Sequence, residues 1–139
     1  MATTSEERIA LAQGGMDAFN DGDMPRMLAA LAEDVEVYAS REMANSGQFT
    51  GHDGFISWMT AWTDAWEVVT AEVTDNSPVG DRHVVTSVHQ EGRGREGIEV
   101  SMDMAFVFEV NDQGKCSFLA MVPSPQEARE LAESREAGS

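Results

Sequence analysis

The stretch "AFNDGDMPRMLAALAEDVEVYA" (Ala18–Ala39) contains three changes of pattern that decide the fold. Its "NDGD" segment ends the helix predicted upstream, because asparagine, aspartate and glycine favour turns. Pro25 suits the first turn of a short second helix, which carries Met27, Leu28 and Leu31. "DVEVYAS" then alternates apolar and polar residues, as a half-buried strand does. The stretch therefore predicts a helix, a short helix and a strand in immediate succession.

Helical spacing continues on both sides of this stretch. Apolar residues recur at that spacing from about Ser5 to Asn20, and the polar, glycine-rich "REMANSGQFTGHDG" (41–54) predicts a long loop. A third helix is expected over about 53–66. Its apolar stripe consists of Phe55, Trp58, Met59, Trp62 and Trp66. Such a stripe packs a core, and its three tryptophans also suit the lid of an apolar cavity.

The second half of the chain predicts a run of antiparallel strands. Strand-like stretches lie at 66–75, 82–91, 97–110 and 115–122, with turns between them. A short charged helix is expected from Pro125 onward, with Ser124 as its N-cap. The order of helices, strand, helix and strands predicts an α+β fold in which helices cover one face of a curved sheet.

The composition limits the classes of partner. A chain of 139 residues with 42% hydrophobic residues is long enough for one globular domain, expected to span 1–139. Nine Lys and Arg against 25 Asp and Glu give this acidic protein a net charge of −16, which repels phosphate backbones and anionic lipids. We therefore expect no nucleic-acid partner and no membrane partner. The N-terminal stretch lacks a secretory pattern, so a cytoplasmic location is expected.

The segment "EVSMDMAFVFEV" (99–110) indicates where one carboxylate points. In a strand, Met102, Met104, Phe106 and Phe108 share one face, and Asp103 lies on the other. Four large apolar residues favour the inner face, so Asp103 is expected to point outward.

The preceding strand alternates in the same way. Val88 and Gln90 are expected to point inward, and His89 outward, where it becomes a cross-strand neighbour of Asp103. We interpret the pair as a structural or interface pair rather than as a catalytic dyad. A β-bulge would shift the alternation and reverse this interpretation.

The sequence predicts neither a metal site nor a cofactor site. His52, His83 and His89 share no ligand spacing with one another or with acids. "GRGREG" (92–97) has the letters of a dinucleotide fingerprint, but the strands on both sides predict a hairpin turn instead of the strand-to-helix turn that holds a pyrophosphate. Cys116 is the single cysteine and suits a small buried side chain.

The opening stretch, "FTGHDGF" before the third helix and "FVFEVNDQGKCSFLAMV" near the end together resemble the nuclear transport factor 2 superfamily, in particular its SnoaL-like polyketide cyclase branch. The resemblance covers about Glu6 to Leu131. It implies a cone-shaped, curved antiparallel sheet wrapped around N-terminal helices and an apolar pocket, as in a cystatin-like α+β barrel. It also implies a homodimer through the outer sheet face. Such folds serve many functions, so the resemblance does not fix one.

The acid–base residues that the resemblance implies are missing. Ketosteroid isomerases of the superfamily use a Tyr, an Asp base and a protonated acid. Cyclases and epoxide hydrolases use an acid in the last strand, and the hydrolases add an Arg and an Asp on the middle strand. These positions fall on or near Gly15, Ala39, Val88, Gln90, Phe106 and Met121. None of these side chains shuttles a proton at neutral pH.

Side chains expected to point into the hollow are the candidates for a ligand pocket. They are Met16, Phe19, Ala39, Phe55, Met59, Trp62, Val88, Gln90, Met102, Met104, Phe106, Leu119 and Met121. The flexible thioethers of methionine suit an adaptable binding surface, and Gln90 is the best-placed polar contact. The polar loop with Arg41, Glu42, Asn45 and Gln48 is expected at the mouth of the cone, either solvated or reaching a ligand.

Three functions remain open from the sequence. The first is binding of a hydrophobic, polycyclic or polyketide-like small molecule, with cyclisation or rearrangement promoted by conformational control. The second is a cyclase or isomerase that uses unusual acid–base residues, either Glu42 or a bulge-flipped Asp103 with His89. The third is a non-catalytic structural or regulatory dimer with a filled core.

Overall fold

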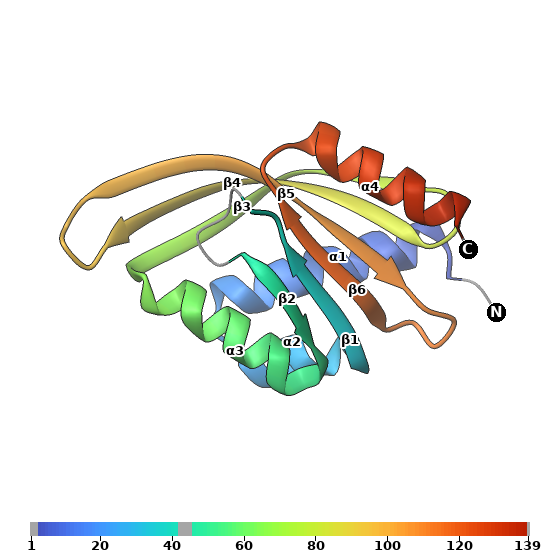
Figure 1. Ribbon diagram of the computed structural model, residues 1–139, viewed down its shortest axis with the longest axis horizontal. Coiled ribbons are helices and arrows are strands. Elements are labelled where there is room, and N and C mark those ends of the chain that lie inside the picture. Colours follow the sequence, from blue (N-terminus) through green and yellow to red (C-terminus); the bar gives the residue numbers. More distant parts are fainter. Residues whose placement is uncertain (1–2, 42–45, 139) are drawn as a thin grey trace.

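The computed structural model describes residues 3–41 and 46–138, which form an α+β arrangement of helices around one curved sheet (Figure 1). The elements are α1 (Ser5–Asn20), α2 (Met24–Ala29), β1 (Leu31–Ala39), β2 (Gly47–Thr50), α3 (Gly51–Asp64), β3 (Trp66–Val79), β4 (His83–Gly94), β5 (Glu99–Val110), β6 (Cys116–Val122) and α4 (Pro125–Ala137). The predicted α+β class is confirmed, and each predicted helix and strand has a counterpart.

Side-chain hydrogen bonds fix the ends of the N-terminal helices. Thr4 Oγ1 accepts from the backbone N–H of Glu7, and the Glu7 carboxylate accepts from the N–H of Thr4, so a capping box begins α1. Asp23 caps α2 in the predicted turn. In the same turn, the Asn20 amide donates to the carbonyl of Ala71 at 2.7 Å and accepts from its N–H at 2.8 Å. These two bonds tie the end of α1 to β3.

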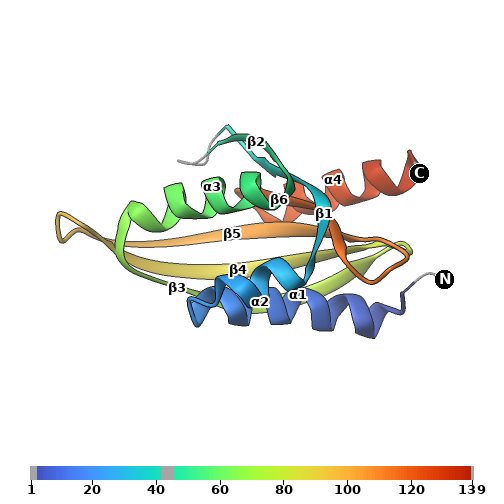
Figure 2. The same cartoon turned by 90° about the horizontal axis from the view of Figure 1, so that it is seen from below.

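The six strands form one sheet in the order β2-β1-β6-β5-β4-β3. Neighbouring strands are antiparallel, except that β1 runs parallel to β6. A long crossover joins β1 to β6, as a parallel pair requires, whereas a hairpin would have made them antiparallel. The sheet bends strongly, but β2 and β3 remain free edges (Figures 1 and 2). The expected antiparallel, barrel-like sheet is thus open and mixed.

Two details differ from the sequence prediction. The predicted loop 41–54 contains β2, in which Phe49 lies opposite Val37 of β1. This strand of four residues is too short to show an alternating pattern. Trp66 begins β3 instead of ending the third helix, which finishes at Asp64 with Ala65 as its C-cap.

Helices cover both faces of the sheet, whereas the sequence predicted them on one face. On the concave inner face, α1, α2 and α3 pack over a cluster that includes Trp58, Met104 and Met121. Figure 2 shows α1 beside β3, and α3 beside β1 and β2, while α2 packs against α1 and β1. On the outer face, α4 covers a second cluster that includes Val107 and Phe118. The inner helices therefore enclose a space over the sheet that α4 does not reach.

The register between β4 and β5 is continuous, with Gln90 opposite Met102 and His89 opposite Asp103. No bulge interrupts this pair, so the alternation read from the sequence holds. Phe106 is buried in the inner cluster, whereas the Asp103 side chain is 82% exposed. The predicted outward direction of Asp103 is confirmed.

Candidate ligand-binding cavity

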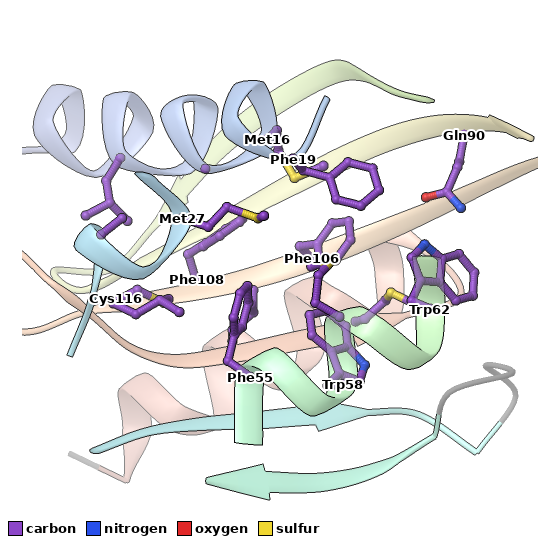
Figure 3. A pocket seen from close by; sticks show the side chains of 17 residues that line it. Met16, Phe19, Met27, Phe55, Trp58, Trp62, Gln90, Phe106, Phe108 and Cys116 are labelled. Atoms are coloured by element: carbon purple, nitrogen blue, oxygen red, sulfur yellow. The ribbon is translucent and has the colours of Figure 1, made fainter. Parts of the chain in front are cut away.

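A cavity lies between α1 and α2 on one side and α3 on the other, above the inner face of β4, β5 and β6 (Figure 3). The volume of the cavity is about 60 Å³. This is room for roughly four water molecules. The lining consists of Leu11, Gly15, Met16, Phe19, Met27, Ala30, Leu31, Phe55, Trp58, Met59, Trp62, Gln90, Phe106, Phe108, Cys116, Leu119 and Met121.

The lining is almost entirely apolar. Among the residues that the structure describes around this cavity, none is Asp, Glu, His, Lys or Arg. Cys116 is the one thiol, and its burial raises its pKa to about 12. At neutral pH the thiol is therefore protonated, so it is a poor nucleophile and a poor base. The described lining thus offers shape and apolar contact in place of proton transfer.

Gln90 on β4 provides the one side-chain amide of the described lining. It is 2% exposed, and the β4 alternation turns its side chain inward. In Figure 3 its amide points into the space between Phe19, Phe106 and Trp62. Its Nε2 atom is buried and has no hydrogen-bond partner. Leaving such a buried donor unpaired costs about 1–3 kcal/mol.

The aromatic wall of the cavity comes from one face of α3. Phe55, Trp58 and Trp62 recur at three- and four-residue spacing, and all three are buried. The ring of Trp62 meets that of Trp66 edge-on, with 5.6 Å between centroids. A Cβ atom at Gly92 would lie 2.5 Å from the Trp66 ring, so a larger residue at this position of β4 would displace that ring. Gly92 thereby supports the ring that holds Trp62 in the wall.

Nine of the thirteen predicted pocket residues line the cavity. They are Met16, Phe19, Phe55, Met59, Trp62, Gln90, Phe106, Leu119 and Met121. The other four lie elsewhere: Ala39, Val88 and Met104 are buried in the inner core, and Met102 is partly buried on β5, opposite Gln90. Whether a ligand occupies the cavity remains a prediction.

The sequence interpretation missed eight lining residues. They are Leu11, Gly15, Met27, Ala30, Leu31, Trp58, Phe108 and Cys116. The α3 stripe and the β5 alternation already contained Trp58 and Phe108, so both were within reach of the pattern. The short helix α2 contributes Met27, and its tilt toward the cavity has no signal in the sequence.

The resemblance implied six positions at which related enzymes carry acid–base residues, and four of these positions line the cavity. Gly15, Gln90, Phe106 and Met121 line it. Their side chains occupy the sites where relatives would place ionisable groups, and they cannot transfer protons at neutral pH. The described lining of this cavity therefore lacks the acid–base residues that the resemblance implied.

His89 and Asp103 lie on the opposite face of the sheet from the cavity. His89 Nδ1 is 2.8 Å from Asp103 Oδ1, and its Nε2 is 3.2 Å from Glu91 Oε1. The hydrogen bond with Asp103, followed by that with Glu91, raises the pKa of His89. The pair faces outward, so it is not placed to act on a molecule in the cavity.

His83 has a surrounding that the sequence did not reveal. It is fully buried under α4, with Nε2 2.7 Å from Glu109 Oε1 and Nδ1 2.5 Å from Glu136 Oε2. Arg135 donates to Glu109 at 2.8 Å. The hydrogen bond from His83, followed by that from Arg135, lowers the pKa of Glu109 to about 2 although desolvation opposes it. This network fastens α4 to the outer face of the sheet.

The polar loop supplies no described contact to the cavity. Arg41 is exposed after β1, and Gln48 is exposed on β2, opposite Tyr38. Glu42 and Asn45 lie outside the described residues. His52, in the first turn of α3, has its Nε2 atom 3.2 Å from the carbonyl oxygen of Leu31.

The described part of the chain contains neither a cluster of metal ligands nor a membrane-spanning helix. Within residues 3–41 and 46–138, no group of three or more His, Cys, Asp or Glu side chains is arranged to hold a metal ion. Across the same ranges, no helix has both the length and the apolar character needed to cross a bilayer.

Residues 12–118 match the family model of the SnoaL-like domain. The chain belongs to the SnoaL-like family. The match includes the whole aromatic face of α3 as well as Gln90, so most of the cavity lies within the shared domain. Among curated proteins, no sequence matches this SnoaL-like chain.

Solved structures share the fold of this SnoaL-like chain. TerC, co-crystallized with polyporic acid, has a TM-score of 0.77 at 20% identity, over 91% of this chain and 98% of TerC. An NTF2-like protein of unknown function from Burkholderia pseudomallei has a TM-score of 0.77 at 19% identity, over 91% and 97% of the two chains. RV0760c from Mycobacterium tuberculosis, in complex with estradiol-17beta-hemisuccinate, has a TM-score of 0.72 at 13% identity, over 83% and 92%. At these identities the likeness establishes the nuclear transport factor 2-like fold alone.

Proposed function

We propose that this SnoaL-like chain binds a hydrophobic, polycyclic or polyketide-like small molecule in the cavity between α1, α2 and α3. The observation that carries the proposal is the apolar cavity itself, enclosed by aromatic and methionine side chains over the sheet. Burial of apolar surface in such a space supplies roughly 25 cal/mol per Å². TerC and RV0760c share the fold and were crystallized with ring-containing small molecules, which supports the same ligand class here.

The cavity must widen to accept a polycyclic molecule. Its volume of about 60 Å³ holds water but not several fused rings. Met16, Met27, Met59 and Met121 line it, and each has three rotatable side-chain bonds. Rotation of these thioethers adapts the walls to a ligand without moving the sheet.

Any reaction in this cavity would rest on the conformation of the bound molecule. A flexible polyketide-like chain held between the rings of α3 and β5 is restricted to few conformers, which lowers the entropic cost of ring closure. The described lining contains no carboxylate and no imidazole that could drive proton transfer. Conformational control is therefore favoured over a cyclase or isomerase that works by acid–base catalysis.

Filling the cavity from α1 tests the binding proposal. Gly15 lines the cavity, whereas Gly14 beside it has open space around it and does not line it. Gly15→Leu is expected to weaken binding of 2-ethylnaphthalene at least tenfold, because the new side chain occupies the ligand's space. Gly14→Leu is the matched control and should bind as the wild type does. Equilibrium dialysis measures both, and equal binding by the two variants would contradict the proposal.

We also propose that two copies pair through the part of the outer sheet face that α4 leaves uncovered. That part lies on β3, β4 and β5, around a shallow groove lined by Val68, Thr70 and Ser101 among others. Val68 is 51% exposed, which is unusual for a large apolar side chain on a strand. A pairing that covered it would remove this apolar surface from water.

A further inference from the structure

We infer that Gln90 makes the cavity selective for uncharged ligands that carry a hydrogen-bond acceptor, such as a ketone, quinone or lactone oxygen. This inference rests on the proposed function and names the ligand class for the same cavity. It starts from the Nε2 atom of Gln90, a buried donor without a partner in a side chain that is 2% exposed. Buried polar groups in native proteins nearly always have a partner. A ligand oxygen would provide it.

The position of Gln90 fixes where that oxygen lies. Gln90 is on β4, opposite Met102 of β5, and its amide points into the cavity beside Trp62 and Phe106 (Figure 3). The rest of the described lining consists of aliphatic, aromatic and sulfur-containing side chains together with glycine, and its other nitrogen donors are the indole N–H groups of Trp58 and Trp62 on α3. A ligand would thus place its rings against α3 and direct one acceptor oxygen toward β4.

Charge excludes acidic molecules from the same site. None of the described lining residues is a cation, so a bound carboxylate would have no ionic partner in a low-dielectric space. The net charge of −16 adds a general repulsion of anions. A neutral acceptor has no charge to bury and is not repelled by the net charge of the protein. Ketones and quinones should therefore bind more tightly than carboxylic acids of similar shape.

Three naphthalene probes of similar size separate these contributions. 2-Ethylnaphthalene has no polar atom, 2-acetonaphthone has an acceptor and no donor, and 2-naphthoate carries a negative charge. The variant Gln90→Met keeps the length of the side chain and removes the amide, with Gln90→Leu as a second variant if the first does not fold. Gln48→Met makes the same exchange at an exposed position of β2 and serves as the control.

Equilibrium dialysis of each probe against each protein gives the ratio of the 2-ethylnaphthalene and 2-acetonaphthone dissociation constants. We expect this ratio to fall at least about tenfold from wild type to Gln90→Met, because the ketone oxygen loses its donor while the hydrocarbon loses nothing. Gln48→Met should keep the wild-type ratio. 2-Naphthoate should bind the wild type at least 100-fold more weakly than 2-acetonaphthone.

Failure of the inference and failure of the proposed function give different results. If both neutral probes bind the wild type but their ratio is unchanged in Gln90→Met and Gln90→Leu, selection by the amide is wrong and cavity binding stands. Tight binding of 2-naphthoate would overturn the exclusion of acids. If neither neutral probe binds the wild type up to its solubility limit, the proposed function falls together with the inference.

Discussion

Two side chains that follow each other on β4, those of His89 and Gln90, have opposite environments. Gln90 is buried in an apolar cavity, while His89 lies on the outer face beside Asp103 and Glu91. The alternation of a strand is sufficient to separate them, since the register with β5 contains no bulge. His89 and Asp103 therefore stay on the outer face, and the Gln90 amide faces the cavity.

The outer pair predicts a change that NMR can measure. Asp103 accounts for the largest part of the raised pKa of His89, and Glu91 for a smaller part. Asp103→Asn is expected to lower the pKa of His89 in a ¹H–¹³C titration, and Glu91→Gln should lower it less. Because Asp103 is 82% exposed, the free energy of unfolding should stay close to that of the wild type. Loss of ligand binding in Asp103→Asn would instead place the pair in the binding machinery.

At the level of elements, α4 is held by part-buried polar contacts as well as by apolar packing. His83 links Glu109 of β5 to Glu136 of α4, and Glu136 also accepts from the backbone N–H groups of Asp81 and Arg82. Desolvation opposes it, but the bonds from His83 and from these two N–H groups leave the pKa of Glu136 lowered. The helix thus fixes the β3–β4 turn from the outer side.

This network predicts a dependence of stability on acid pH. The folded pKa of Glu109 is about 2, below its ordinary value of 4.5, so its contribution is complete above pH 4.5 and is lost as the pH falls toward 2. Glu109→Gln should cost at most about 3 kcal/mol at pH 7 and should flatten the fall in unfolding free energy between pH 4.5 and 2. Urea unfolding across this range measures the slope. Glu133→Gln, at an exposed position of α4, should keep the wild-type slope.

The sequence predicted the elements better than their surroundings. The turn at Asn20, the α3 stripe and the β5 alternation each follow from periodicities within one segment. Each is confirmed, except that Trp66, predicted as the last residue of the stripe, begins β3. The setting of His83 could not be predicted, because its partners lie 26 and 53 positions away and meet only when α4 folds back. Likewise, the contribution of α2 to the cavity depends on how the helix is tilted and not on its composition. Local patterns determine faces, whereas contacts between distant segments need the assembled fold.

For the whole molecule, the net charge opposes pairing of two copies, whereas the uncovered apolar part of the outer face favours it. Each copy carries a net charge of −16, so two copies repel at low salt, and added salt screens this repulsion within about 10 Å at 0.1 M. The α4 helix already covers Phe118 and its neighbours, which leaves β3 with Val68 as apolar surface for a second copy. If pairing occurs there, it should strengthen as the salt concentration rises.

Light scattering coupled to size-exclusion chromatography tests this pairing at 0.05 M and 0.5 M NaCl. We expect the mass of two chains at the higher salt concentration and a larger fraction of single chains at the lower one. Val68→Glu adds a like charge from each copy at the proposed contact and should leave single chains at both concentrations. Gln113→Glu adds the same charge in the exposed β5–β6 turn, away from this face, and should pair as the wild type does. If Val68→Glu forms dimers as stable as those of the wild type, the contact lies elsewhere. Burying two uncompensated carboxylates at the contact would destabilise the dimer by more than burial of the Val68 side chains stabilises it.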